Sequence, residues 1–401
     1  MKSSVNNKYM VVQGFFWMTY CIATGFTSLY LLGEGAANAT IGIVTAVFGA
    51  ISAIIQPILG RICDKSEKIS WKGMLLTCAA IELALCICMC FMSGRLLSCV
   101  FMGSLILVAN LCMPFVNSAL FYYKSNEEYV NFGIARGIGS GSYALLALII
   151  GNLAVIYGTK TVPAVGIVIV LGFIAIIFMM PYDAKLDNSH VIGDEIKNKS
   201  GIIDFIRKYP SFFIMLVGFI FLATTHNVSM TYLLQIIQSV GGNSENLGVC
   251  IAIQATVEIP VLFLSVKIMK KYSAKSLMVF AAFGYVIKAT LFYLAGSVTM
   301  LYFVGLSQMI SFAIFASASV YYTGETVYEE DRTIGQSLMT SVIAIGTVLG
   351  NLIGGWVLDM LGIRHMLSIN VMIGLVGLVI VLLSLKVKET KNDGEKNFTL
   401  D

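Results

Sequence analysis

The chain has 401 residues and a formal net charge of +4; 58% of its residues are hydrophobic and 12% are charged. Soluble globular domains are roughly 45–50% apolar and about 25% charged. A chain with half the usual charge cannot cover its surface with groups that bind water. The composition therefore excludes a soluble enzyme, a nucleic-acid binder and a disordered protein, and it predicts an integral membrane protein.

Twelve apolar stretches are each long enough for a helix that crosses the membrane, which needs about 20 residues. In chain order they are 10–32, 40–62, 73–92, 96–121, 133–156, 161–180, 210–240, 247–268, 276–295, 299–322, 334–361 and 365–385. The sequence therefore predicts an all-α integral membrane protein with twelve transmembrane helices.

A polar segment, 182–209, lies in the middle of the chain. It predicts a linker between an N-terminal six-helix bundle (1–181) and a C-terminal six-helix bundle (210–387), with 388–401 as a tail. Lysine and arginine gather in the loops on the side of both termini, whereas the opposite loops hold Arg95, Lys160 and Arg364. Because cytoplasmic loops carry the excess of positive charge, the termini and the linker are predicted to be cytoplasmic, in a multi-pass protein of the cytoplasmic membrane.

Short motifs recur half a chain length apart. Pro57 ends the second span as Pro260 ends the eighth, and Gly-Asn pairs occur at 151–152 and 350–351. Parallel repeats of six helices with a substrate site at their interface are typical of major facilitator transporters. Glycines four residues apart predict close helix packing in both halves. They are Gly133, Gly137, Gly141, Gly346, Gly350 and Gly354.

Ionisable side chains at membrane depth are costly and indicate functional sites. Glu258 in the eighth span has apolar neighbours, and Lys288 in the ninth and Arg136 in the fifth are the cations available to it. A carboxyl that either a proton or a cation neutralises suits a proton-coupled carrier; the alternative is a fixed ion pair between the halves. Glu82, a lone acid in the third span, is the second candidate for proton coupling.

Arg136 opens the fifth span, and Tyr143 follows seven residues later on the same helical face. A guanidinium and an aromatic ring on one face can bind a hydroxylated ring by hydrogen bonds and stacking. The alternative is that Arg136 only adds positive charge to the cytoplasmic end of its helix. Further residues predicted to contribute to the substrate site are His226, Asn227, Gln308, Asn117 and Tyr20. For His226, a hydrogen-bonded contact between helices is the alternative.

The second span and the loop after it resemble those of the major facilitator superfamily. Gly60 and the pair Asp64-Lys65 occupy the places of the family's Gly-x-x-x-Asp-Arg/Lys motif. The resemblance implies that Gly60, Asp64 and Lys65 form a conformational gate, whose contacts stabilise one face of the transport cycle.

A closer similarity is to the oligosaccharide and nucleoside proton-symporter branch, which includes lactose permease. Residues 132–139 resemble the branch's Phe-Gly-x-x-Arg-x-x-Gly element. The resemblance implies that Arg136 binds a sugar on which Tyr143 stacks. It also implies that Glu258 serves sugar binding and proton coupling, and that Lys288 takes the place of a functional arginine. The branch's acid in the fourth span and its His and Glu in the tenth have no counterpart, which implies a solute other than lactose.

These observations predict a secondary active transporter that moves a small polar organic solute, sugar- or nucleoside-like, by alternating access with protons or another ion. We expect a monomer in the lipid bilayer, without nucleic acid, cofactor or metal. An enzyme is not expected because the sequence has no catalytic or phosphate-binding motif, and unlike charges in the spans disfavour a channel. Two alternatives stay open: a drug or metabolite exporter of the same fold, and a membrane sensor that does not transport.

Overall fold

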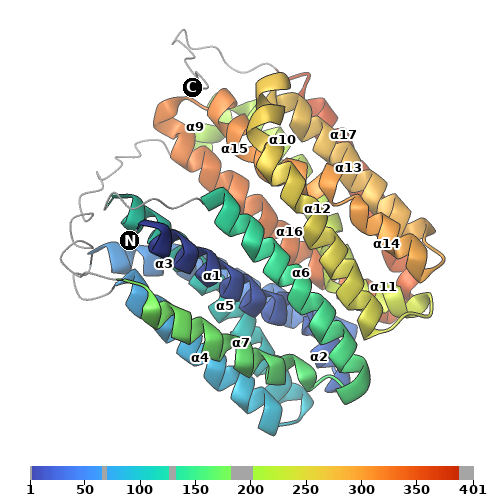
Figure 1. The fold of residues 1–401 in the computed structure, drawn as a ribbon. Coiled ribbons are helices and arrows are strands. Elements are labelled where there is room, and N and C mark those ends of the chain that lie inside the picture. The colour runs from blue at the N-terminus through green and yellow to red at the C-terminus, as the bar shows by residue number, and fades with distance from the viewer. Residues whose placement is uncertain (1, 66–69, 126–131, 182–201, 388–401) are drawn as a thin grey trace. The chain divides into compact units, whose positions relative to one another are not determined.

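The computed structural model describes residues 2–65, 70–125, 132–181 and 202–387, and every regular element in these ranges is a helix. Figure 1 shows them in a colour that runs from blue at the N-terminus to red at the C-terminus. They are α1 (Lys2–Tyr20), η1 (Cys21–Gly25), α2 (Thr27–Gly33), α3 (Asn38–Lys65), α4 (Trp71–Phe91), α5 (Arg95–Ser125), α6 (Phe132–Tyr157), α7 (Thr161–Met179), α9 (Ile202–Lys208), α10 (Pro210–Thr231), α11 (Leu233–Ser239), α12 (Ser244–Lys271), α13 (Ala274–Leu294), α14 (Val298–Leu306), η3 (Met309–Ala313), α15 (Ile314–Thr326), η4 (Glu329–Asp331), α16 (Arg332–Leu361) and α17 (Ile363–Ser384).

Within the described ranges, eleven stretches are long and apolar enough to cross a membrane, counting α14 to α15 as one. A bent pair, Val5–Gly25 with Thr27–Gly33, makes up to twelve if it forms a single span. The predicted all-α membrane fold is therefore confirmed. The seventh predicted span is divided, because α10 ends at Thr231 and α11 begins at Leu233.

The helices form two compact units. Unit 1 is Met1–Asp194 with Thr231–Thr256, and unit 2 is Glu195–Met230 with Val257–Asp401. The segment Thr231–Thr256 packs with unit 1, where the Gln235 amide donates to Asn38 Oδ1 at 2.8 Å. The predicted division at 182–209 places this segment in the C-terminal bundle instead; most of that linker and the tail 388–401 lie outside the described residues.

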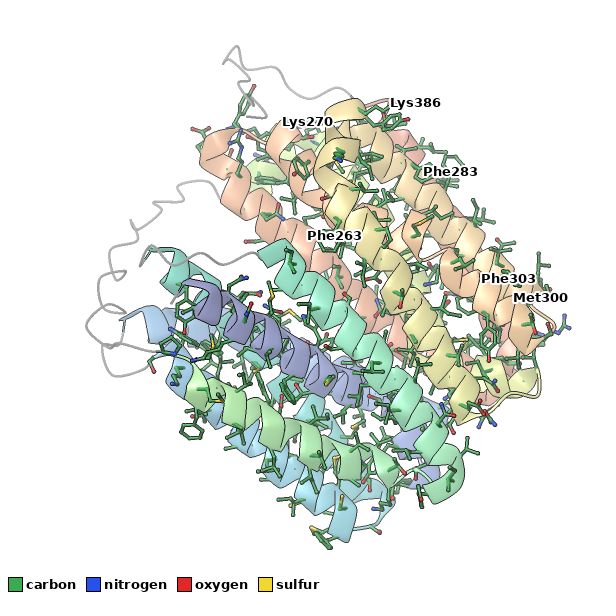
Figure 2. All side chains as sticks on the ribbon, in the orientation of Figure 1. Phe263, Lys270, Phe283, Met300, Phe303 and Lys386 are labelled. Carbon is green, nitrogen blue, oxygen red and sulfur yellow. The ribbon has the colours of Figure 1, made fainter. Side chains whose placement is uncertain are left out.

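The core of unit 1 lies among α1, α4, α5 and α7, and α6 lies along α1 (Figure 1). The core of unit 2 is formed mainly by α10, α13 and α15, and α13 also lies along α17. Large apolar side chains on the outside of unit 2 point away from its helices (Figure 2), among them Phe263, Phe283 and Phe303. A chain in water would not keep such a surface, whereas lipid tails cover it without cost.

The first span bends by 47° at Phe26. Here the helix widens into η1. The Thr24 hydroxyl donates a hydrogen bond to the carbonyl of Tyr20 at 2.7 Å, and the Thr27 hydroxyl donates to that of Ala23 at 2.6 Å. Hydroxyls that bond to the preceding turn compete with the helical ladder and bend membrane helices.

The tenth span is interrupted at Ser307 and Gln308, between α14 and the π-helical turn η3. Gly284 of α13 faces this turn so closely that a Cβ atom there would overlap the carbonyl of Ile310. A π-helical turn widens the helix and is frequent at functional sites. It presents Gln308 toward α13 and α12.

Candidate functional site

Arg136 lies near the start of α6 in unit 1. Its Nη1 donates a hydrogen bond to Ser140 Oγ at 2.6 Å, and its Cζ lies 3.8 Å from the centroid of the Trp17 ring. The electron-rich indole face attracts the cation, and the planar guanidinium also stacks on it. Gly139 makes room for this contact, because a Cβ atom there would overlap the Trp17 ring.

Two predicted aromatic residues surround the same indole ring. Tyr20 and Tyr143 meet the Trp17 ring edge-on, with centroids 5.3 and 6.5 Å away. The Trp17 Nε1 donates to Gln13 Oε1 at 3.1 Å, and the Tyr20 hydroxyl donates to Asn110 Oδ1 at 3.3 Å. The guanidinium therefore lies among three aromatic rings, of which the sequence predicted Tyr20 and Tyr143 but not Trp17, because aromatic residues are common in membrane helices.

No contact joins Asn117 or Gly60 to this group among the described residues. Asn117 on α5 is partly buried, and among the described residues no hydrogen bond joins it to Arg136 or Tyr20. Gly60 near the end of α3 has open space where a Cβ atom would point. The side chains of Asp64 and Lys65 lie outside the described residues, so the gate stays a prediction.

A line of hydrogen bonds joins three predicted polar residues in unit 2. Nζ of Lys288 donates to Oε1 of Gln308, and Nε2 of Gln308 donates to Oε1 of Glu258 at 2.6 Å. Lys288 is 2% exposed and Gln308 4% exposed. An ammonium only donates and a carboxylate only accepts, so one orientation of the amide satisfies both. We call Lys288, Gln308 and Glu258 the amide bridge.

Helix irregularities lie beside two members of the amide bridge. Gln308 directly precedes η3, and Glu258 lies two residues before Pro260 inside α12. A proline has no backbone N–H, so the carbonyl of Thr256 loses its helical donor. The two side chains therefore come from positions where the backbone can adjust.

His226 of α10 lies beside the amide bridge, close enough to Lys288 for an electrostatic interaction. Its ring is stacked on Phe312 of η3, with centroids 5.0 Å apart and planes at 12°. The edge of Tyr285 on α13 meets the ring at 5.9 Å. Nδ1 of His226 is buried and has no hydrogen-bond partner in the part of the chain that the structure describes. At this atom, therefore, no hydrogen bond joins His226 to a neighbouring helix.

Asn227 faces a different helix from the amide bridge. Its Nδ2 donates to the carbonyl of Ala223 at 2.8 Å, and its Oδ1 accepts from the Thr347 hydroxyl of α16 at 3.1 Å. Gly350 of α16 packs against the same turn, since a Cβ atom there would lie 3.1 Å from the Asn227 Cβ. These contacts join α10 to α16.

Glu82 lies inside unit 1 on α4. The residue is 0% exposed, and neither carboxyl oxygen has a hydrogen-bond partner among the described residues. The Thr19 hydroxyl lies near the carboxyl, but it donates to the backbone carbonyl of Phe16 at 2.9 Å. The other interacting groups are the thiols of Cys78, Cys86 and Cys112.

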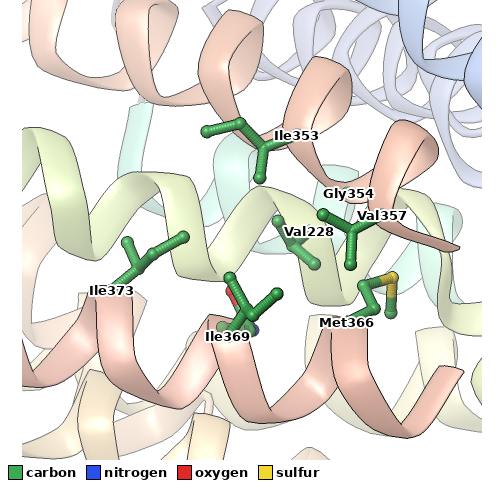
Figure 3. Close-up of a pocket in the computed structure, with 8 residues that line it drawn as sticks. Val228, Ile353, Gly354, Val357, Met366, Ile369 and Ile373 are labelled. Atoms are coloured by element: carbon green, nitrogen blue, oxygen red, sulfur yellow. The ribbon is translucent and has the colours of Figure 1, made fainter. Parts of the chain in front are cut away.

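Figure 3 shows a separate pocket in unit 2, lined by apolar side chains of α10, α16 and α17. Its polar lining residue, Asn370, donates through its amide to the Thr225 carbonyl and to Ser229 Oγ, both at 3.1 Å. No predicted site residue lines this pocket. In the described parts of the chain, no group of three His, Cys, Asp or Glu side chains is arranged to hold a metal ion.

Charged groups outside the spans form ion pairs and hydrogen bonds in each unit. In unit 1, Glu34 pairs with Lys160 at 3.1 Å and accepts hydrogen bonds from Ser98 Oγ at 3.1 Å and the Gly94 amide at 3.4 Å. Burial alone would raise the pKa of the Glu34 carboxyl. The hydrogen bonds and the charge of Lys160 outweigh burial and lower this pKa below its ordinary value.

In unit 2, Lys208 of α9 pairs with Glu330 at 2.6 Å and with Asp331 at 2.8 Å. The Tyr209 hydroxyl donates to the same Asp331 carboxylate at 2.9 Å. Burial, followed by the hydrogen bond to Asp331, raises the pKa of Tyr209 to about 12. These contacts tie the segment before α10 to the start of α16.

Solved structures of transporters share this fold. The nucleoside transporter NupG has a TM-score of 0.80 at 12% sequence identity, covering 95% of this chain and 98% of that one. A bacterial homologue of the human lysosomal transporter Spinster, inward-facing, has a TM-score of 0.66 at 15% identity, covering 96% and 97%. A variant of the peptide transporter POT has a TM-score of 0.70 at 12% identity, covering 96% and 97%. At these identities the similarity concerns the fold alone.

No curated protein sequence matches the chain. The sequence does match the MFS_1 like family over residues 9–369, which is most of its length. The predicted resemblance to the major facilitator superfamily is thereby confirmed, and this family and fold are those of membrane transporters rather than of enzymes. The chain therefore belongs to the MFS_1 like family.

Proposed function

We propose that the chain is a secondary active transporter that moves a small polar organic solute, sugar- or nucleoside-like, across the cytoplasmic membrane by alternating access with protons. The amide bridge carries this proposal. Lys288 and Glu258 are opposite charges within membrane spans, and one neutral amide joins them. Apolar side chains of similar volume would stabilise a bundle as well or better than such charges. Their presence is therefore explained by binding a polar solute.

The group around Arg136 supports the same proposal from unit 1. Its guanidinium offers several hydrogen-bond donors in one plane, and Trp17, Tyr20 and Tyr143 offer ring faces and hydroxyls. Such groups bind hydroxylated or flat rings. We expect Arg136, Tyr143 and Tyr20 to be the solute-binding set of this unit.

In unit 2 we expect Glu258, Lys288 and His226 to bind the solute, and Gln308, which is hydrogen-bonded to both charged groups, to belong to the same site. Asn227 bonds to Thr347, which suits a residue that positions α10 rather than one that contacts solute. Asn117, and the gate at Gly60, Asp64 and Lys65, stay predictions. So do the monomeric state, the cytoplasmic termini and the division into bundles at 182–209.

Proton coupling is assigned to Glu258, with Glu82 as a second candidate. Glu258 is partly buried and hydrogen-bonded by Gln308, so a proton and a solute donor can compete for its oxygens. A carboxyl that must be either protonated or bound by a solute donor couples the two fluxes. The fold neighbour named as a nucleoside transporter supports the solute class by analogy.

The test uses the purified full chain in proteoliposomes, with radiolabelled nucleosides and sugars and an imposed proton gradient. We expect accumulation that a protonophore abolishes, and saturable counterflow without the gradient. Glu258→Gln should lose accumulation and keep exchange. Glu245→Gln, on the exposed first turn of the same helix, is the matched control and should keep both.

Three results would contradict this proposal. Gradient-driven accumulation by Glu258→Gln would remove the proton role of that residue. Efflux without uptake, together with drug sensitivity in cells that lack the protein, would favour the exporter. Binding without counterflow for every solute that binds would favour the sensor.

A further inference from the structure

We propose that the solute carries a planar edge with an N–H donor beside a carbonyl acceptor, as in a lactam or a cyclic imide. This edge replaces the amide of Gln308 between Lys288 and Glu258. The inference rests on the proposed transport function and narrows its solute class from sugar- or nucleoside-like to compounds with an amide-bearing ring.

The first step is the chemistry that the two charged groups require. Lys288 donates to the carbonyl oxygen of the Gln308 amide, and Glu258 accepts from its nitrogen. Any group between them must therefore accept on one side and donate on the other. A lactam edge has this pattern on neighbouring atoms of one plane, as the side-chain amide does. A single hydroxyl has both functions on one oxygen, so the charged groups would have to move together to share it.

The second step is the flat surface beside the amide bridge. His226 and Phe312 are stacked at 12°, and the Tyr285 ring stands at 82° to His226. A planar heterocycle can pack against aromatic rings over its whole face, whereas a puckered sugar presents hydroxyls and axial hydrogens to them. The buried, unpartnered Nδ1 of His226 adds a polar atom for a second carbonyl or ring nitrogen.

The third step is that the resident amide can leave. Gln308 lies where α14 ends and η3 begins, so the turn that carries it is irregular. The Ser307 hydroxyl donates to the carbonyl of Val304 at 2.5 Å, and the Ser311 hydroxyl donates to the carbonyl of Ser307 at 2.8 Å. The turn therefore keeps these hydrogen bonds when the Gln308 side chain moves away. Glu258 is partly buried rather than fully buried, so it is the most exposed of the three residues of the amide bridge.

The experiment compares uridine with 3-methyluridine on the detergent-purified full chain by calorimetry, with methyl galactoside as the sugar probe. The methyl group removes the N–H between the two ring carbonyls and changes little else. We expect uridine to bind at least tenfold more tightly than 3-methyluridine, because one hydrogen bond to a carboxylate is lost and the carboxylate is left unpaired. Equal affinity for the two nucleosides, or tighter binding of the sugar, would overturn the proposal.

A second variant tests the displacement itself. In Gln308→Ala the resident amide no longer competes, so uridine should bind several-fold more tightly than to the wild type, and acetamide should raise the unfolding temperature of the variant alone. Loss of uridine binding in a folded Gln308→Ala protein would show that Gln308 contacts the solute and is not replaced by it. If the variant does not fold, the comparison of uridine with 3-methyluridine on the wild type still tests the proposal.

The transport proposal fails separately from this one. Counterflow of a sugar without nucleoside binding would leave a transporter and refute the lactam edge. Uridine binding that depends on the N–H, without counterflow or accumulation, would support the edge and refute transport.

Discussion

The guanidinium carbon of Arg136 lies 3.8 Å from the centre of the Trp17 ring, while one of its nitrogens donates to Ser140. The stacking therefore occupies one face of the guanidinium. A lysine cannot reproduce this contact, because an ammonium has neither a face nor a planar fork of donors.

Arg136→Lys should weaken solute binding about five- to thirtyfold, since about 1–2 kcal/mol of stacking and hydrogen bonding is lost. The measurement is calorimetry with the solute that the wild type transports. Arg95→Lys, the same exchange at an exposed helix start, is the control and should bind as the wild type does. Unchanged affinity in Arg136→Lys would mean that Arg136 only adds positive charge to its helix end.

The sequence predicted the spans closely because their signal, a long run without charge, is local. It also singled out Glu258, Lys288 and Gln308, since polar groups are conspicuous in such runs. Their connection was not predictable, because 50 residues separate Glu258 from Gln308 and the contact depends on how α12, α13 and η3 pack. Trp17 escaped notice for the opposite reason, as one aromatic residue among many.

The glycine pattern shows the same limit. Gly346 and Gly350 pack against backbone atoms of α10, as close packing predicts. Gly141, at the corresponding spacing in the first half, has nothing within 4 Å of a Cβ position, and Gly139 and Gly151 make the close contacts of α6 instead. Spacing indicates a face of the helix, but the neighbouring helix decides which glycine matters.

Gly350→Ala should destabilise the chain by about 1–3 kcal/mol, because the new Cβ would lie 2.7 Å from the Thr224 carbonyl oxygen and the helices would have to separate. Gly141→Ala is the matched control in open space and should be neutral or stabilising by about 0.5–1 kcal/mol. Thermal unfolding in detergent measures both. Equal effects would mean that α10 and α16 are not packed through Gly350.

The Glu34 carboxyl should make the free energy of unfolding of the chain depend on pH in the acidic range. Its pKa is lowered in the folded state, so its contribution is fully present above the pKa of the unfolded chain and is lost as the pH falls through the folded value. The unfolding temperature of the wild type should therefore decrease with acidification over the acidic range of carboxyl titration. In Glu34→Gln this part of the decrease should be absent.

The control for this experiment is Glu245→Gln, which removes an exposed carboxyl from a first helical turn. Its pH profile should parallel that of the wild type. If Glu34→Gln also parallels the wild type, the pair with Lys160 contributes no net stability, as many partly exposed ion pairs do not.

Glu82 separates stability from function. A fully buried carboxyl without a hydrogen-bond partner costs free energy, so Glu82→Leu, with a side chain of similar size, should preserve or raise the unfolding temperature. Glu82→Gln keeps an unpartnered polar group at the site and should gain less. Marked destabilisation of Glu82→Leu would show that the carboxyl makes a stabilising contact.

The transport assay then gives the second reading of the same variants. If Glu82 carries a coupled proton, a stable Glu82→Leu protein should keep solute counterflow and lose accumulation against a gradient, as Glu258→Gln does. Accumulation at the wild-type level would remove Glu82 from proton coupling and leave Glu258 as the coupling carboxyl. In that case Glu82 would serve neither stability nor transport. Both quantities, the unfolding temperature and the accumulation of solute, should therefore be measured on one preparation of each variant.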